Sequence, residues 1–325
     1  MHLDYMIGDE DTEFPGMLRS YLDEPVAEES DWDQAELVEY VNLEHRHLFS
    51  VIRNYNEDWF GRYVFVPLVS GQYEYYLPLD CVTVRCVEIV NASAVTGSAP
   101  FFAVNELISG AQEVGEVNLS DKDSPYTFTR NTGNSRFGTG YYLFDDQLIL
   151  QPNAQIGSQY YLRIYYLPSA PDLHRGKAQA GAAGSITLGA DAADETVGYI
   201  RTIDNYYKGM RIEIIAGTGA GQTRRVSKYV GSTRVADVDS TWSTTPDNTS
   251  IYSIVSPIKE DFQELLILGG ALRAKGIKVE DDTTGIGAIY SALRTDMDNS
   301  LDQRNHQRNR RVTSRGGTRH GTNSK

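Results

Sequence analysis

Few residues in this sequence have the type and spacing that metal binding or thiol chemistry requires. His45 and His47 are two positions apart, and side chains at that spacing diverge on a helix, so we do not expect them to bind a metal together. Cys81 and Cys86 are five apart, which is not the CxxC spacing of redox or zinc sites. We therefore predict buried, reduced thiols, and no metal or cofactor.

Carboxylates are abundant, but acid–base catalysis needs two of them in different environments. The densest run resembles a solvated loop leading into a helix, and consists of Asp23, Glu24, Glu28, Glu29, Asp31 and Asp33. The sequence therefore predicts no catalytic residue and a protein that is not an enzyme.

Residues 217–222, Gly-Thr-Gly-Ala-Gly-Gln, could suggest a loop that binds phosphate. Such a loop precedes a helix and needs a third glycine where Gln222 stands. Residues 223–229 alternate like a strand, so we predict a hairpin turn instead.

Length and charge limit the possible classes. The 325 residues suffice for two domains, or for one domain with an insertion. The chain has 44 acidic and 30 basic residues, and this negative net charge disfavours a surface that binds DNA or an anionic membrane. The longest apolar run, Leu265–Leu272, contains two glycines and is too short to span a membrane. The acidic N-terminus does not resemble a secretory signal.

The charge is distributed unevenly along the chain. Residues 1–60 contain 16 acidic and 3 basic residues, whereas residues 304–325 contain seven basic residues and no acidic one. This polar, basic tail cannot bury enough apolar surface to fold alone, so we predict that it is disordered when free. Basic tails usually bind an acidic partner, although a solvated tail without a partner remains an alternative.

Hydrophobic periodicity predicts helices at about 33–58 and 17–22, and a short helix near 104–111. Alternation predicts strands around 64–66, 73–77 and 82–86, with a turn at Gly71. Two further strands flank the pair Asp145-Asp146, and another covers 160–166.

From about residue 178 the composition shifts towards Gly, Ala, Thr and Ser, and short alternating runs predict a small all-β module. After Pro257 the period is helical again. One expected face holds Phe262, Leu265, Leu266, Gly269 and Leu272, and the next helix has a stripe of Ile286, Ile289, Tyr290, Leu293, Met297 and Leu301.

Because the order of elements lacks βαβ alternation, we predict an α+β fold rather than a doubly wound one. Its expected parts are a helical bundle core with an antiparallel β-sheet (1–177 and 256–303), an inserted, sandwich- or barrel-like all-β domain (178–255), and a disordered basic C-terminal arm (304–325).

The 21 tyrosines are concentrated in adjacent pairs on the expected strands. One member of each pair should face the core and the other should face outward. Such a face favours protein contact, because a platform for single-stranded nucleic acid needs interleaved Lys and Arg. The candidates for subunit or tail contacts are Tyr73, Tyr75, Tyr76, Tyr161 and Tyr165.

Three ordered stretches resemble the head–tail adaptor (connector) proteins of tailed bacteriophages. They are residues 17–80, with Trp32, Asn42, VSGQYEY (69–75) and LPLD (77–80); LILQP (148–152) leading to YYLP (165–168); and DFQELL (261–266) leading to GGA (269–271). Two further motifs, GTGAGQTR (217–224) and TWSTTPD (241–247), are similar to a β-module inserted in phage structural proteins.

The resemblance implies a structural protein at the head–tail junction of the virion, made and assembled in the host cytoplasm. It implies a ring, commonly of twelve copies, beneath the portal, with no membrane contact. The C-terminal arm would bind the portal, and the opposite face would receive a nozzle, stopper or tail tube. Genomic DNA would pass through without specific binding. The residues of the arm that would contact the portal are Arg304, Arg308, Arg310, Arg311, Arg315 and Arg319.

Two other classes remain open at this point. One is a protein of the tail tip or fibre whose β-module recognises a cell-surface glycan, and the other is a carboxylate-based hydrolase of cell-wall sugar.

Overall fold

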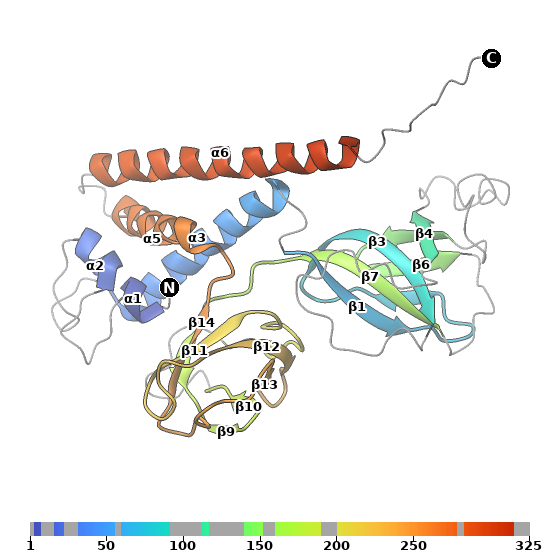
Figure 1. The fold of residues 1–325 in the computed structure, drawn as a ribbon, viewed down its shortest axis with the longest axis horizontal. Coiled ribbons are helices and arrows are strands. Elements are labelled where there is room, and N and C mark those ends of the chain that lie inside the picture. The colour runs from blue at the N-terminus through green and yellow to red at the C-terminus, as the bar shows by residue number, and fades with distance from the viewer. Residues whose placement is uncertain are drawn as a thin grey trace, which may run out of the picture.

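The computed structural model describes residues 3–7, 16–22, 32–55, 60–91, 112–116, 140–151, 160–189, 200–277 and 283–314. A layer of helices lies above the sheet formed by β8–β14, and the sheet formed by β1–β7 extends to the side (Figure 1). This mixture of helices and mainly antiparallel sheets confirms the α+β class.

The helical layer is built around one buried helix. Its elements are α1 (Leu3–Ile7), α2 (Gly16–Leu22), α3 (Gln34–Tyr55), the short 3-10 helix η5 (Glu260–Phe262), α5 (Glu264–Ile277) and α6 (Thr284–Ser314). The helices expected at 17–22 and 33–58 are confirmed as α2 and α3. The main-chain N–H of Ala35 donates to the Asp33 carboxylate, 3.4 Å away, at the start of α3. The short helix expected at 104–111 lies outside the described residues.

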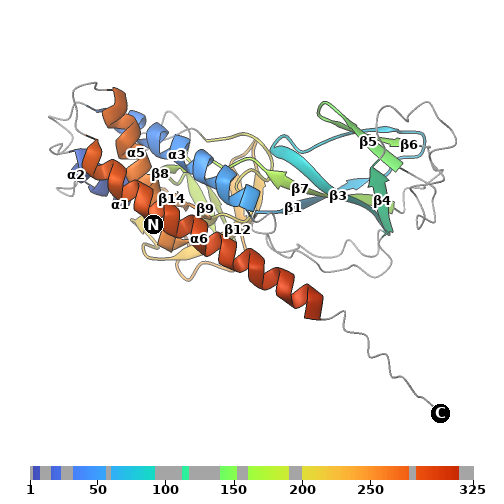
Figure 2. The ribbon, with the colours of Figure 1, turned by 90° about the horizontal axis from the view of Figure 1, so that it is seen from above.

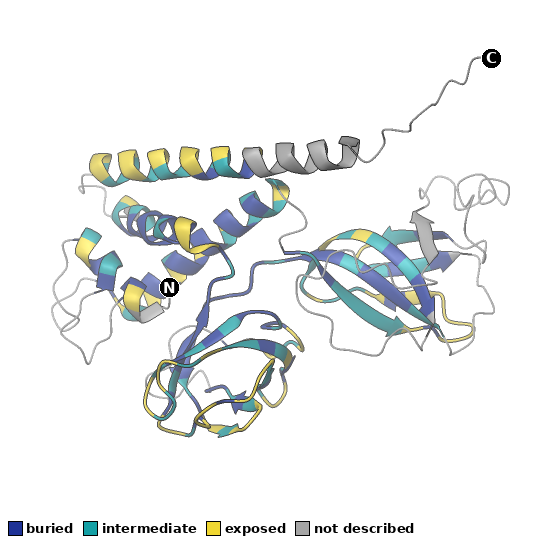
Figure 3. Cartoon of the chain, in the orientation of Figure 1, coloured by how far each residue is buried: buried dark blue, intermediate teal, exposed yellow. Residues whose placement is uncertain are grey.

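Helix α5 is buried around its whole circumference from Leu265 to Ala271, not along one stripe as expected, and Leu272 is only half-buried. Glycine makes this possible at Gly269, where a Cβ atom would lie 2.3 Å from Cγ of Glu44 on α3. The burial pattern is visible in Figure 3, where the outer side of the first half of α6 is exposed and α5 is largely covered.

The first sheet contains seven strands in the order β1-β7-β3-β4-β5-β6-β2. Their bounds are β1 (Arg62–Pro67), β2 (Glu74–Tyr76), β3 (Cys81–Asn91), β4 (Gln112–Glu116), β5 (Gly140–Phe144), β6 (Gln147–Gln151) and β7 (Tyr160–Pro168). The neighbouring pairs are antiparallel except for β4 and β5, which are parallel. The expected strands on both sides of Asp145-Asp146 are confirmed as β5 and β6, and Asp145 has a positive φ of 53° in their turn.

The second sheet also has seven strands, in the order β8-β14-β11-β12-β13-β10-β9. They are β8 (Arg175–Lys177), β9 (Ala180–Ala182), β10 (Ser185–Thr187), β11 (Arg211–Ala216), β12 (Thr223–Val230), β13 (Val235–Val238) and β14 (Ile251–Val255). One apolar cluster joins this sheet to the helices, and a separate cluster lies within the first sheet. The division of the chain into a core and an inserted domain stays a prediction.

The prediction that helical structure ends where the basic tail begins is wrong, because α6 continues to Ser314. The chain contains neither Gly nor Pro between Gly287 and Gly316, so nothing in the backbone interrupts the helix. Of the expected stripe, Met297 and Leu301 are buried, Ile289 is 47% exposed, and the other three residues are half-buried against the core, namely Ile286, Tyr290 and Leu293.

Candidate interaction surfaces

The groups considered first for metal or thiol chemistry lie apart. His45 is fully buried and His47 is half-exposed on the same helix, so the predicted divergence is confirmed. Cys81 and Cys86 are not in a disulfide and are half-buried rather than fully buried as expected, and burial raises the pKa of the Cys81 thiol to about 11. Within the described ranges, no three His, Cys, Asp or Glu side chains form a group that could hold a metal ion.

The glycine-rich segment 217–222 is the predicted hairpin turn, joining the antiparallel strands β11 and β12. Gln222 stands where a third glycine would be needed to bind phosphate. Its side-chain Nε2 donates to the carbonyl oxygens of Gly219 (3.0 Å) and Thr244 (2.9 Å), and its Oε1 accepts from the Ser243 N–H at 2.7 Å. The two motifs 217–224 and 241–247 are thus tied together in space, and Gln222 has a structural role.

The tyrosine pair on β2 alternates as predicted. Tyr75 faces the core of the first sheet and is 2% exposed, whereas Tyr76 is 68% exposed and Tyr73 is 47% exposed. The Tyr75 hydroxyl accepts a hydrogen bond from the Val69 N–H at 3.2 Å. Tyr75 therefore has almost no exposed surface with which to contact another protein. The contact role of the other candidates stays a prediction.

Tyr161 and Tyr165 lie on β7 and are half-buried. The guanidinium of Arg163 lies 4.8 Å from the centre of the Tyr165 ring, and Nε of Arg163 donates to the Glu88 carboxylate at 2.6 Å. Burial raises the pKa of Tyr165 to about 12. Both tyrosines are half-buried, so they offer less surface to a partner than the exposed Tyr73 and Tyr76.

The structure also reveals an exposed apolar surface around β2 that the sequence analysis identified only in part, through Tyr73 and Tyr76. It holds six of the nine large apolar side chains that are exposed among the described residues. We call it the β2 patch, and its members are Val69, Tyr73, Tyr76, Leu79, Val82 and Phe144. Tyr76 and Phe144 both lie opposite Gln147 on β6, so they flank it on one face of the sheet. The available signal was the density of large apolar residues within positions 69–82, where seven occur and no helix is expected.

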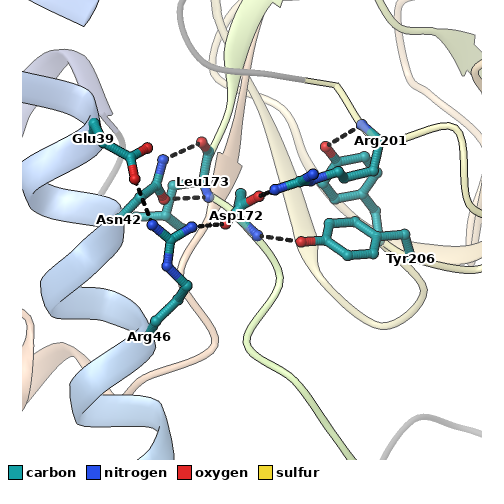
Figure 4. A network of polar contacts seen from close by, with 8 residues as sticks. Glu39, Asn42, Arg46, Asp172, Leu173, Arg201 and Tyr206 are labelled. Atoms are coloured by element: carbon teal, nitrogen blue, oxygen red, sulfur yellow. Dashed lines mark hydrogen bonds and ion pairs between the residues drawn. The ribbon is translucent and has the colours of Figure 1, made fainter. Parts of the chain in front are cut away.

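A buried polar network joins α3 to the segment that connects the two sheets (Figure 4). Asp172 accepts hydrogen bonds from Nη1 of Arg46 at 2.8 Å and from Nη2 of Arg201 at 2.7 Å. Beside it, Asn42 accepts from the Leu173 N–H at 2.7 Å and donates to the Leu173 carbonyl oxygen at 3.2 Å. This network fixes the connecting segment against the helical layer.

A second polar cluster connects the first sheet to the rest of the chain. Arg62 on β1 forms an ion pair with Asp80 (2.7 Å), and the Tyr166 hydroxyl donates to the same carboxylate at 3.1 Å. Nη1 of Arg62 also lies 3.5 Å from the carbonyl oxygen of Tyr206 beside the second sheet. Since Arg62 and Asp80 are both nearly buried, separating them would leave a charge without its partner.

Glu44 is a buried carboxylate that connects three helices. It accepts hydrogen bonds from Nη2 of Arg273 on α5 at 2.9 Å and from the hydroxyl of Tyr290 on α6 at 2.6 Å. Burial and this hydrogen bond raise the pKa of Tyr290 to about 12. Figure 2 shows α6 running across the other helices, and Glu44 fixes the N-terminal half of α6 in that position.

The distal half of α6 contains the first basic positions of the predicted arm. Arg304, Arg308 and Arg311 follow helical spacing and so share one helix face by position. Arg310 lies on the same helix, whereas Arg315 and Arg319 lie outside the described residues. None of the helices in the described ranges is long and apolar enough to cross a membrane.

Comparison with known proteins gives a family match. Residues 15–192 match the family model described as SU10 adaptor protein, which covers more than half of the chain and includes α2, α3, the first sheet and the start of the second. No curated protein matches the chain.

Proposed function

The chain belongs to the SU10 adaptor protein family, a family of phage head–tail adaptors, and on that premise we propose that it forms a ring joining the portal to the tail. In this proposal the ring stands at the head–tail junction of the virion, commonly with twelve copies, and genomic DNA passes through it. The family is a structural one rather than a family of enzymes.

The observation that carries the proposal is helix α6. Its N-terminal half is held on the helical layer by Tyr290, Met297 and Leu301, and its distal half extends beyond the end of α3 (Figure 1). A basic helix that projects from an acidic protein suits insertion into an acidic groove of a neighbouring oligomer. Because a ring presents many such arms together, binding of each arm raises the effective concentration of the next.

The charge distribution supports passage of DNA without specific binding. Acidic residues outnumber basic ones by 14 over the whole chain, although the charged residues among the last 22 are all basic. A negative wall repels phosphate, so a passing genome would not adhere to it. The tail protein that binds the opposite face of the ring would be a nozzle, stopper or tail tube.

Cryo-electron microscopy of virions tests the location, and we expect a ring of this protein between portal and tail. Location in a distal fibre would contradict the proposal and favour glycan recognition by the second sheet.

Truncation tests the arm. Removal of residues 304–325 should abolish binding to purified portal, because it removes the distal part of α6. Removal of residues 316–325 alone is the matched control, and it should retain binding because Arg304, Arg308 and Arg311 remain. If the arm binds DNA instead, affinity should decrease with salt by about 0.9 log units per log unit for each phosphate contact, and that result would contradict a role at the portal.

A further inference from the structure

Strands β1 and β2 follow each other in the chain but do not pair with each other. Between them, the Gln72 N–H donates to the Val69 carbonyl oxygen at 3.1 Å, and Gly71, the third residue of this turn, has a φ of +85°. A positive φ at that position is the mark of a type II turn, which splays the strands that it joins. Accordingly, β1 pairs with β7 and β2 pairs with β6, and the two strands form opposite ends of the sheet.

The hydrogen bonds of β2 show which of its backbone groups face outward. The Leu150 N–H donates to the Tyr73 carbonyl oxygen at 2.9 Å, and the Leu77 N–H donates to the Asp146 carbonyl oxygen at 2.8 Å. Alternate residues of a strand point to opposite sides, so the backbone groups of Glu74 and Tyr76 point away from β6.

One of these outward groups is already occupied, because Nε2 of Gln72 donates to the Glu74 carbonyl oxygen at 2.8 Å. Three groups remain without a partner among the residues that the structure describes. They are the N–H of Glu74 and both the N–H and the C=O of Tyr76.

The same reasoning applies to β1. The Leu68 N–H donates to the Tyr160 carbonyl oxygen at 3.0 Å, so residues of even number on β1 point towards β7 and the backbone groups of Phe65 and Pro67 point away. Phe65 offers both a donor and an acceptor. Pro67 offers only an acceptor, since proline has no N–H.

The two edges complement each other group by group. When Phe65 is aligned opposite Tyr76 in an antiparallel pair, their backbones exchange two hydrogen bonds, and Pro67 then lies opposite Glu74. The Glu74 N–H donates to the Pro67 carbonyl oxygen. The N–H that Pro67 lacks would have faced the Glu74 carbonyl, which Gln72 already satisfies.

The faces of the two strands agree as well. Tyr75 faces the core of the first sheet, and so do Val64 and Val66. Phe65 and Tyr76 therefore both lie on the opposite face. Pairing the edges would continue the sheet without turning a core side chain towards solvent.

We propose that the β2 edge of one copy pairs with the β1 edge of the next copy, so that the first sheets form a continuous band around the ring. This inference rests on the proposed function, because it assumes a ring. The turn at Gly71 keeps β1 and β2 of one chain apart, so the two complementary edges cannot pair within that chain. A second copy of the chain presents the same two edges and is therefore the partner that fits. Pairing of two different edges is heterologous and repeats around an axis, as a ring requires. Pairing of β2 with β2 would close a dimer and leave the donor of Glu74 without the matching acceptor of Pro67.

The contact is weak in isolation, because β2 contains only three residues and a short edge forms few hydrogen bonds. The exposed side chains of the β2 patch add apolar contact at the same place. A closed ring repeats the contact at every subunit, so assembly becomes strongly cooperative. We therefore expect monomers in dilute solution and rings at high concentration or on the portal.

Hydrogen exchange measured by mass spectrometry tests the pairing directly. In the monomer, the amides of Glu74 and Tyr76 should exchange rapidly. In the ring, peptides that cover residues 72–78 should exchange at least tenfold more slowly. Slow exchange already in the monomer would mean that the chain has closed its own edges, which would overturn the inference.

Proline substitution removes the outward N–H without breaking a hydrogen bond inside the chain. Tyr76→Pro should weaken ring assembly at least tenfold more than Tyr76→Ala, because both variants lose the side chain and only the first loses the donor. Glu74→Pro and Glu74→Ala form a second matched pair. Circular dichroism and thermal unfolding of the monomers show whether each variant keeps the fold, and analytical ultracentrifugation measures assembly.

Several outcomes would overturn the pairing. The pairing would be refuted if the Pro and Ala variants assembled equally well, or if the protein formed a dimer that does not extend to a ring. It would also be refuted if the Tyr76 amide became protected from hydrogen exchange only when a different phage protein was added. If the wild type forms a ring at the portal while these amides exchange as in the monomer, the inference fails and the proposed function stands. Absence of the protein from the head–tail junction would instead remove the proposed function.

Discussion

Replacement of Asn42 by Ala tests whether the connecting segment is held to α3 by one side chain. Asn42 is 3% exposed and Leu173 is 1% exposed, and two hydrogen bonds join the Asn42 amide to the Leu173 backbone. In Asn42→Ala, the N–H and C=O of Leu173 lose their partners in a buried place. An unsatisfied buried group costs about 1–3 kcal/mol, so the free energy of unfolding should decrease by about 3 kcal/mol.

Urea unfolding followed by tryptophan fluorescence and by circular dichroism measures this loss. Because about 1.4 kcal/mol corresponds to a factor of ten, local opening should also accelerate exchange of the Leu173 amide about a hundredfold. Asn54→Ala is the matched control, since Asn54 is exposed on the same helix, and it should change stability by less than about 0.5 kcal/mol. A loss below about 1 kcal/mol in Asn42→Ala, with unchanged exchange at Leu173, would refute the reasoning.

Three further predictions concern the helical layer. Gly269→Ala should destabilise the protein by about 1–3 kcal/mol in urea unfolding, because the new methyl group would overlap Glu44; Gly276→Ala, where nothing lies within 4 Å, should be neutral or stabilising by up to about 1 kcal/mol. Burial lowers the pKa of His45 to about 4, so the unfolded chain binds more protons than the folded one between about pH 6.5 and 4, and stability should decrease by about 3 kcal/mol as the pH falls through that window. His45→Gln should abolish this component, and an unchanged pH slope would contradict it. Glu44→Gln should lower the pKa of Tyr290, because the raised value depends partly on the Glu44 carboxylate. Ultraviolet titration of tyrosinate measures this change, and an unshifted transition in the variant would contradict the account.

Local patterns predicted the local elements of the fold. The apolar spacing after Asp33 predicted α3, the pair Asp145-Asp146 predicted the hairpin of β5 and β6, and alternation after Gln222 predicted the hairpin of β11 and β12. Each of these features depends on residues that are close in sequence, so periodicity and turn chemistry are sufficient.

Contacts between elements that are far apart in the sequence could not be predicted from such local patterns. Glu44 resembles a solvated helix carboxylate in the sequence, and only its contact with Arg273, 229 positions away, identifies it as buried. The extent of α6 was missed for a different reason. The composition of residues 304–325 suggested disorder, but the absence of Gly and Pro before Gly316 allows a helix that is already anchored at Tyr290 to continue.

The candidate surface was predicted only in part. Tyr73 and Tyr76 are exposed as expected of contact residues, while Tyr75 is buried by the alternation of the strand. Leu79, which lies between β2 and β3, and Phe144, the last residue of β5, were absent from the prediction because a single apolar residue at such a position carries no periodic signal. Their exposure depends on which strands end the sheet, and that is a property of the topology.

Helix α6 is long relative to the region that anchors it. A helix rises about 1.5 Å per residue, so Ser314 stands about 36 Å from Tyr290, the residue that Glu44 binds. Such a helix acts as a lever, and a tilt of about 10° at the Glu44 contact displaces its tip by roughly 6 Å, about one helical turn. Small repacking around Glu44 would therefore be converted into a large change in where the distal arginines can reach.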